Sequence, residues 1–395
     1  MRRTWPHSAE LVAVLATISL VPVLASRVPQ SSHWASSVQG PVPPQFQYSE
    51  RPYTVEPMVE VLFPKDSSDC ASIQSILRST PSVPLTGPAA IHLLRAYRMS
   101  TLARGDVKTG TDIIRHLTGL TQTTPSNEAL PFVKTRSGIR FRAYHARGAG
   151  NQLGESHRDL FLATFAELGV PLSTSLANLG ADRVELSDAL RDSVTHFHLD
   201  QDPIEWTSIA YVLYMAGAAG WSNCDGDRFT FDQLASELLH RDMSRCSCGG
   251  GHVLSAMTLL VRTNDDLRFL SPRTAAELEQ RLASEVSTAI ATQSEDGSWA
   301  PDWQFNPSIA LAMKAPGDAG RFLTTSHLVE WMVYLPHRLQ PKKATYVRAS
   351  AWLLAHIRSI DTAPTGVPNA ELCPWTHAVC ALRAMCPSST TRPAG

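Results

Sequence analysis

The least ordinary stretch of this sequence combines two thiols, three glycines and an imidazole in RCSCGGGH, residues 245–252. Zinc in proteins binds thiolate sulfur and imidazole nitrogen, and a catalytic zinc keeps one of four positions open. The C-x-C-x3-H spacing therefore indicates a candidate metal motif. The glycines let the backbone approach a ligand closely and direct free N–H groups toward it. The alternative interpretation is a flexible loop with two buried thiols that leads into a helix.

A histidine also recurs in a repeated motif. The segment HLLRAY at His92 matches HVLSAM at His252 and HAVCAL at His377. The copies begin at His92, His157, Trp206, His252, His327 and His377. Their commonest spacing, about 50 residues, fits one helical hairpin with its loops, and such periodic self-similarity indicates a repeat architecture.

Segments with polar faces lie between these copies. They predict helices over 67–79, 111–119, 185–196, 230–240, 274–293 and 343–357. A helix that is apolar nearly all round is buried, whereas one with a charged stripe faces water. The motif segments are poor in charge, so we expect six inner helices within six outer ones. The predicted fold is all-α, an (α/α)6 barrel or toroid, and each motif histidine lies in the first turn of a parallel inner helix. A small β-hairpin insertion is predicted near 131–146, where the sequence alternates around Ser137-Gly138.

Parallel inner helices would bring these side chains to one mouth of the barrel. The predicted pocket is lined by His92, Glu205, Trp206, His252, His327 and His377. If zinc is the cofactor, the predicted ligands are Cys248, His252, His327 and His377. The alternative is that each histidine only donates to a neighbouring carbonyl.

Carboxylates at such a mouth could perform acid–base chemistry. The catalytic candidates are Asp159 and Glu330, with His157 beside the first of them. Paired carboxylates serve this role in (α/α)6 glycosidases and polysaccharide lyases. The alternative is that these acids are solvated near helix N-termini, where the helix dipole favours them.

One further motif carries a family resemblance. The heptapeptide QSEDGSW, residues 293–299, resembles the Gln-Trp repeat, Q-x-x-D-G-x-W, of the terpenoid cyclase and protein prenyltransferase superfamily of α/α toroids. The resemblance covers about residues 58–386. It implies that Gln293 tethers an outer helix, that Trp299 packs beneath the loop, and that the ligand is a small or lipid-like molecule. The acidic D-x-D-D cluster of class II cyclases is absent from the sequence, and Cys246 stands where the zinc-binding prenyltransferase subunits have aspartate.

The N-terminus predicts export. Two arginines precede an uncharged apolar run over 11–24, too short to span a bilayer, so residues 1–25 are predicted to be a signal peptide or an N-terminal anchor. A Pro/Ser-rich linker is expected over 26–57, the toroid domain over 58–388 and a disordered tail over 389–395. Seven cysteines leave at least one thiol unpaired.

Composition narrows the function classes. With 43% hydrophobic residues, the chain can bury a full core. Its net charge of −1 gives it no overall positive potential that would attract nucleic acid. We therefore expect an exported protein that acts on or binds a small or lipid-like molecule, with zinc as the candidate cofactor and membrane contact only through a retained N-terminal anchor. The alternatives are a carbohydrate-active (α/α)6 enzyme and a non-catalytic scaffold of the cell envelope.

Overall fold

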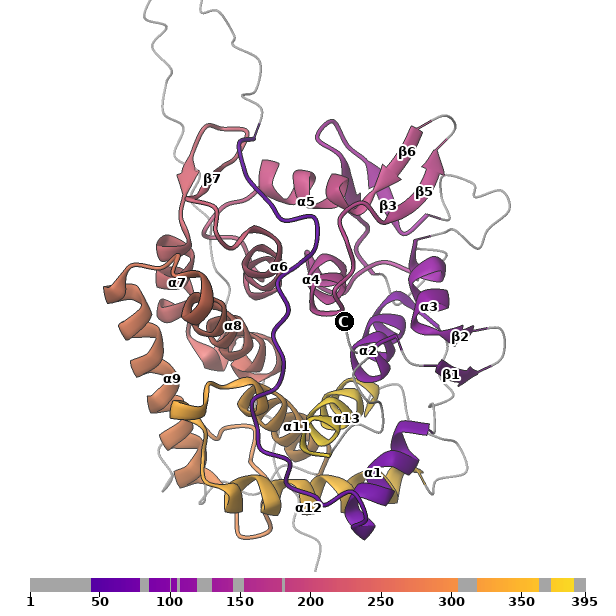
Figure 1. Ribbon diagram of the computed structural model, residues 1–395, viewed down its shortest axis with the longest axis vertical. Coiled ribbons are helices and arrows are strands. Elements are labelled where there is room, and N and C mark those ends of the chain that lie inside the picture. The colour runs from indigo at the N-terminus through magenta and orange to yellow at the C-terminus, as the bar shows by residue number, and fades with distance from the viewer. Residues whose placement is uncertain are drawn as a thin grey trace, which may run out of the picture. The chain divides into compact units, whose positions relative to one another are not determined.

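The computed structural model describes residues 44–78, 85–99, 101–104, 107–118, 130–144, 153–179, 182–304, 318–361 and 371–386. Most of these residues are helical, and the strands among them are short, so the all-α class is confirmed (Figure 1). The predicted signal segment 1–25, the linker up to residue 43 and the tail 389–395 lie outside the described residues. Within the described part, no helix has the length and apolar character needed to cross a membrane.

The repeated motif gives a set of six apolar helices. They are α2 (Gly87–Tyr97), α4 (Leu160–Glu167), α6 (Glu205–Met215), α8 (Gly251–Leu267), α11 (Asp318–Tyr334) and α13 (Leu372–Met385). The helices pack in the order α2, α4, α6, α8, α11, α13, and α13 packs back on α2 (Figure 1). Most side chains of these helices are buried, as expected for helices that are apolar on most sides.

The amphipathic segments form the helices that pack against this set. They are α1 (Ser68–Arg78), α3 (Gly110–Leu117), α5 (Leu186–Thr195), α7 (Phe231–His240), α9 (Pro272–Thr292) and α12 (Lys343–Asp361). Each matches one predicted segment to within a few residues. Their starts follow from local chemistry: Thr109 and Thr230 close capping boxes, and Ser271 caps α9 just before its proline. Their apolar stripes face the inner set, with α3 on α2, α5 on α4, and α12 on α11 and α13.

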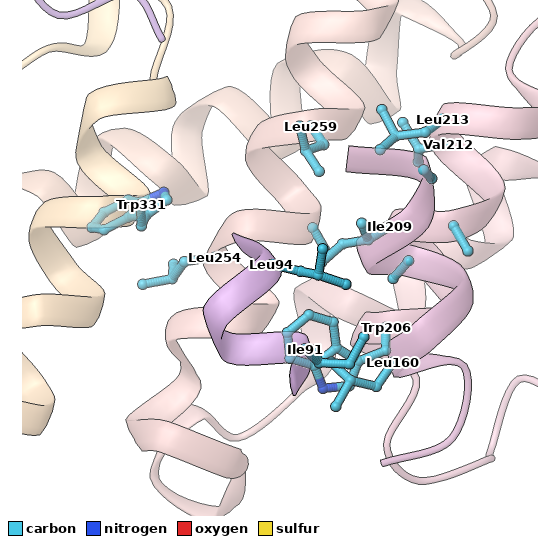
Figure 2. Close-up of a cluster of buried hydrophobic side chains, with 14 of the residues drawn as sticks. Ile91, Leu94, Leu160, Trp206, Ile209, Val212, Leu213, Leu254, Leu259 and Trp331 are labelled. Atoms are coloured by element: carbon cyan, nitrogen blue, oxygen red, sulfur yellow. The ribbon is translucent and has the colours of Figure 1, made fainter. Parts of the chain in front are cut away.

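The core lies between the six apolar helices. Figure 2 shows Leu94 of α2, Ile209 of α6 and Leu254 of α8 turned toward a common interior. These side chains are fully buried. Burial of apolar area contributes about 25 cal/mol per Å² and is the main force that holds the helices together.

Short antiparallel pairs connect the helices. They are β1 (Thr101–Arg104) with β2 (Val107–Thr109), β3 (Phe132–Lys134) with β4 (Ile139–Phe141), β5 (Ser175–Leu179) with β6 (Asp182–Glu185), and β7 (Trp221–Ser222) with β8 (Arg228–Phe229). Short 3-10 helices η1 (Met243–Arg245), η2 (Ser247–Gly250) and η3 (His337–Leu339) complete the described elements. The pair β3–β4 is the hairpin predicted near 131–146, in register from Phe132 opposite Phe141. Arg140 ties it to Asp192 of α5 at 2.8 Å.

The Gln-Trp loop, residues 293–299, follows α9 and is hydrogen-bonded to α12. The amide of Gln293 donates to the carbonyls of Gly297 and Thr345, both at 3.0 Å, and so links the end of α9 to the start of α12. The indole of Trp299 is fully buried and donates to the Ala289 carbonyl at 2.7 Å. Gly297 has a φ of 95°, and a Cβ there would lie 2.3 Å from the Arg348 carbonyl oxygen. These contacts match the roles that the resemblance implies for Gln293 and Trp299.

Residues 44–63 form an extended strap across the helix ends (Figure 1, indigo). Backbone N–H groups of Tyr53, Met58 and Leu62 donate to carbonyls at the C-terminal ends of α6, α11 and α13, at 2.7, 2.9 and 3.0 Å. The last carbonyls of a helix have no partner within it, so the strap satisfies groups that would otherwise need water. From residue 44 onward, the predicted linker is therefore packed on the helices rather than free of them.

A disulfide joins α1 to the residue that follows α13. Cys70 of α1 bonds Cys386, just after α13, with Cα atoms 5.7 Å apart and 316 residues between them in sequence. It is the one disulfide among the described residues, and the other five cysteines are free. A cross-link that closes a long loop restricts the unfolded chain strongly.

Replacing Cys70 and Cys386 together by serine should lower the free energy of unfolding by about 2–5 kcal/mol, because the unfolded chain regains the freedom that the cross-link removes. Urea denaturation measures the change. Cys224→Ser, at a free and partly exposed thiol, is the control and should change stability by less than about 0.5 kcal/mol. An unchanged unfolding midpoint in the double variant would contradict a stabilising disulfide.

Candidate metal centre

Four of the motif histidines meet between the inner helices. The ring centroids of His327 and His377 are 3.8 Å apart, and the His252 centroid lies 5.1 and 5.5 Å from them. His92 joins from α2, with its ring 5.6 Å from that of His377. The rings of His252, His327 and His377 are buried. Side chains from α8, α11, α13 and α2 thus form one imidazole cluster.

Of the motif histidines, only His252 lies in the first turn of its helix, as the sequence predicts for all of them. Helix α11 begins at Asp318, nine residues before His327. Thr86 caps α2 and Pro88 lies in its first turn, so His92 falls in the second turn, as does His377 in α13. His157 precedes α4. The helices therefore start at different levels, and their packing, rather than a common first turn, brings the rings together.

Trp206 extends the cluster toward His157. Its ring lies 4.3 Å from that of His252 and is stacked on His157 at 6.4 Å. Arg95 lies over the same indole at 5.3 Å. The Trp206 indole nitrogen is buried without a hydrogen-bond partner among the described residues. Glu205, the neighbouring predicted pocket residue, is buried at the start of α6, and burial raises its pKa.

Cys248 joins the histidines through an unusual backbone turn. Its φ is 53°, a left-handed value, and Gly249 and Gly250 continue in the same region before α8 begins at Gly251. A Cβ on Gly251 would lie 3.1 Å from the His327 Cβ, so a side chain there would crowd α11. The result is that the ligand atoms of Cys248, His252 and His327 all lie within 4.8 Å of one another.

The environment favours a thiolate at Cys248. A hydrogen bond from the Cys373 thiol lowers the pKa of Cys248, against the effect of burial, and the charge of His327 lowers it further. Burial opposes the charged form of His327, but the Cys248 thiolate outweighs it and raises the pKa of this imidazole. Burial lowers the pKa of His252 and keeps that ring neutral. A thiolate and neutral imidazoles are the forms that bind metal ions.

The other ring nitrogens are held by acceptors. His327 Nδ1 donates to the Leu323 carbonyl at 2.7 Å, and His377 Nδ1 donates to the carboxylate of Glu330. Such a bond fixes the tautomer and leaves Nε2 as the nitrogen that can bind a ligand. Arg95 also contacts Glu330, at 3.4 Å. Burial would raise the pKa of Glu330, but Arg95 and His377 hold it well below its usual range.

The structure divides the predicted ligand set. Cys248, His252 and His327 form one group, whereas His377 falls with His92 and Cys373, whose ligand atoms also lie within 4.8 Å of one another. Sequence reasoning missed Cys373. A signal was present, because CPWTH at 373–377 has the same C-x3-H spacing as CGGGH at 248–252.

The predicted catalytic residues lie in two different environments. Asp159 accepts hydrogen bonds from Ser193 at 2.8 Å and from Thr207 at 2.6 Å, and together with His157 it lines a cavity beside β4. Glu330 belongs to the imidazole cluster. Hydrogen bonding therefore engages Asp159 and Glu330 with different partners and does not pair them.

A second cavity lies between the strap and the cluster. Tyr53 and Val55 of the strap form part of its wall, and its polar groups come from Arg95, Arg98, Glu167, Ser255, Glu330 and Tyr334. The apolar part of the lining includes Leu213 of α6, Leu259 of α8 and Trp331 of α11 (Figure 2). Glu330 thus contacts both the cavity and the imidazole cluster.

Comparison of the chain with models of protein families, with curated proteins and with solved structures finds no match. The chemistry of Cys248 and the histidines is therefore the main guide to function.

In the metal-free protein, Cys248 should react with iodoacetamide at a nearly constant rate between pH 6 and 8, because its lowered pKa keeps the thiolate formed throughout. Peptide mass spectrometry resolves each thiol. Cys224 is an internal reference, and its rate should rise about tenfold per pH unit, as for an ordinary thiol. Cys373→Ala removes the donated hydrogen bond and should make the Cys248 rate depend on pH. If the alkylation rate of Cys248 in the unmodified protein rises tenfold per pH unit, Cys248 is not a thiolate over this pH range and the prediction is wrong.

Proposed function

We propose that this chain is an exported zinc protein whose ion is bound by Cys248, His252 and His327 inside an (α/α)6 toroid. The observation that carries the proposal is the approach of these three ligand atoms to within 4.8 Å of one another. The thiolate character of Cys248 and the fixed Nδ1 of His327 support it. One sulfur and two imidazoles suit zinc, and three protein ligands with an open fourth position are typical of catalytic zinc sites.

The toroid is supported by the packing order of the inner helices. Each of the six packs against two others, the order returns from α13 to α2, and the amphipathic helices lie against this set. The Gln293 and Trp299 contacts agree with the resemblance to the terpenoid cyclase and prenyltransferase superfamily. A toroid of this kind places the ligands of one ion on different inner helices.

The substrate or ligand is proposed to be a small or lipid-like molecule. Support comes from the cavity beside the strap, whose lining combines apolar side chains such as Leu213, Leu259 and Trp331 with charged groups that include the pair Arg95 and Glu330. Bound zinc would act as a Lewis acid or lower the pKa of a bound water. The chain's own contribution is to orient His377 through Glu330 and to exclude solvent with the strap.

Export is supported by two observations. The N-terminal sequence has the charge and apolar pattern of a secretory signal. The disulfide between Cys70 and Cys386 is of a kind that persists in oxidising compartments.

The two alternatives have less support. A scaffold would satisfy each inward histidine with a neighbour, yet His377 Nε2 is buried with no partner among the described residues. A carbohydrate-active enzyme needs free opposed carboxylates. Asp159 is instead bonded to Ser193 and Thr207, and Glu155 caps the backbone N–H groups of Asp159 and Phe161.

The purified protein should contain stoichiometric zinc by elemental analysis. Cys248→Ser and His327→Gln should each lower the zinc content by one equivalent, because each removes one of three ligands. Cys224→Ser, at a thiol outside the cluster, is the matched control and should retain all the zinc. Protein that contains no stoichiometric zinc, and takes up none on dialysis against zinc, would refute the proposal.

A further inference from the structure

We propose that Cys373, His377 and His92 form a second metal site beside the first, for a cation such as Zn²⁺ that accepts sulfur and imidazole ligands. The ligand atoms of these three residues lie within 4.8 Å of one another. Cys373 and His377 come from α13, and His92 comes from α2, which packs against it. The site uses none of the three residues assigned to the first ion.

The two sites repeat one arrangement. Each has a cysteine and a histidine separated by three residues, Cys248 with His252 and Cys373 with His377. Within α13 this spacing puts both side chains on the same helix face. Each site is completed by a histidine from the next inner helix in the packing order, His327 of α11 for the first and His92 of α2 for the second.

A buried nitrogen without a partner points to a ligand at the second site. His377 Nε2 is buried and makes no hydrogen bond with any described residue. A buried polar atom left without a partner costs about 1–3 kcal/mol. The other nitrogen of the ring donates to Glu330, the bond that typically orients a metal-binding histidine. A metal ion at Nε2 would supply the missing partner.

A hydrogen bond to Thr376 orients His92 in the same way, so that its Nε2 can bind a metal ion. The hydroxyl of Thr376 donates to the Cys373 carbonyl at 2.8 Å, so it can accept from His92 Nδ1, 3.4 Å away. This bond leaves the lone pair of His92 Nε2 free. Three histidines of the cluster, namely His92, His327 and His377, thus bond through Nδ1 and keep Nε2 for another partner.

The two sites are adjacent. The thiols of Cys248 and Cys373 share a hydrogen bond, the rings of His327 and His377 are 3.8 Å apart, and Cys373 Sγ lies 3.9 Å from His327 Nε2. Two cations held by neighbouring ligands can both stabilise negative charge on one bound molecule. The arrangement is therefore that of a paired metal centre.

Zinc content per chain tests the second site. The unmodified protein, dialysed against zinc and freed of excess, should hold two equivalents. His92→Gln and His377→Gln should each hold one, and so should Cys248→Ser. His198→Gln, which alters the exposed group formed with Asp225 and Asp227, is the control and should keep two. Far-UV circular dichroism and the melting temperature establish that each variant folds. If His377→Gln does not fold, His92→Gln alone tests the second site, since His92 is only partly buried and its replacement should disturb the fold less.

Thiol protection gives an independent measurement. In Cys248→Ser, zinc should slow the alkylation of Cys373 at least tenfold, and adding His92→Gln should abolish this protection. Equal alkylation of Cys373 with and without zinc would overturn the second site.

The outcomes separate this inference from the proposed function. If the unmodified protein holds one zinc equivalent, and this zinc is lost in Cys248→Ser and kept in His92→Gln, the second site is overturned and the first remains. If this zinc is kept in Cys248→Ser and lost in His92→Gln, the first site is overturned and the second remains. Loss of all metal in either variant would indicate a single shared site and overturn the second. No metal in any sample, or a disulfide between Cys248 and Cys373 found by mass spectrometry, would overturn both.

Discussion

The guanidinium of Arg95 is the contact on which the interior of the molecule depends. It reaches from α2 to Glu167 at the end of α4, to Glu330 of α11 and over the Trp206 ring of α6. Removing one partner of a buried ion pair costs about 3–5 kcal/mol, because the remaining charge has no water to solvate it. The helices must therefore keep the register that pairs Arg95, and that register also sets the position of His377 through Glu330.

Burial and charge together decide which groups of the cluster are ionised. Desolvation, followed by the charge of Arg95, lowers the pKa of His92 to about 3. Glu330 stays ionised in the same surroundings because Arg95 and His377 compensate for its burial. The cluster thus holds neutral imidazoles at His92 and His252, while the thiolate of Cys248 favours the charged form of His327. This distribution of charge suits a cation and does not suit an anion.

Much of the helix pattern could be predicted, because apolar periodicity and the repeated motif are local signals. The amphipathic segments match α1, α3, α5, α7, α9 and α12, and four of the five motif histidines do meet. The grouping of ligands could not be predicted, since it depends on which helices are neighbours: His377 shares a site with Cys373 and His92 because α13 packs on α2. The strap and the disulfide were also missed, because both join segments that are distant in sequence and carry no local pattern.

The chain of inner helices has one interruption in sequence, between its last member, α13, and its first, α2. Three features hold the structure near this seam: the disulfide of Cys70 with Cys386, the strap bond from Leu62 to the Met385 carbonyl, and the contact of Cys373 and His377 with His92. The other neighbouring inner helices are joined by the chain itself. Reduction of the disulfide would therefore remove the covalent link between α1 and the end of α13, and would leave the strap bond and the packing of α13 on α2 to hold this part of the structure.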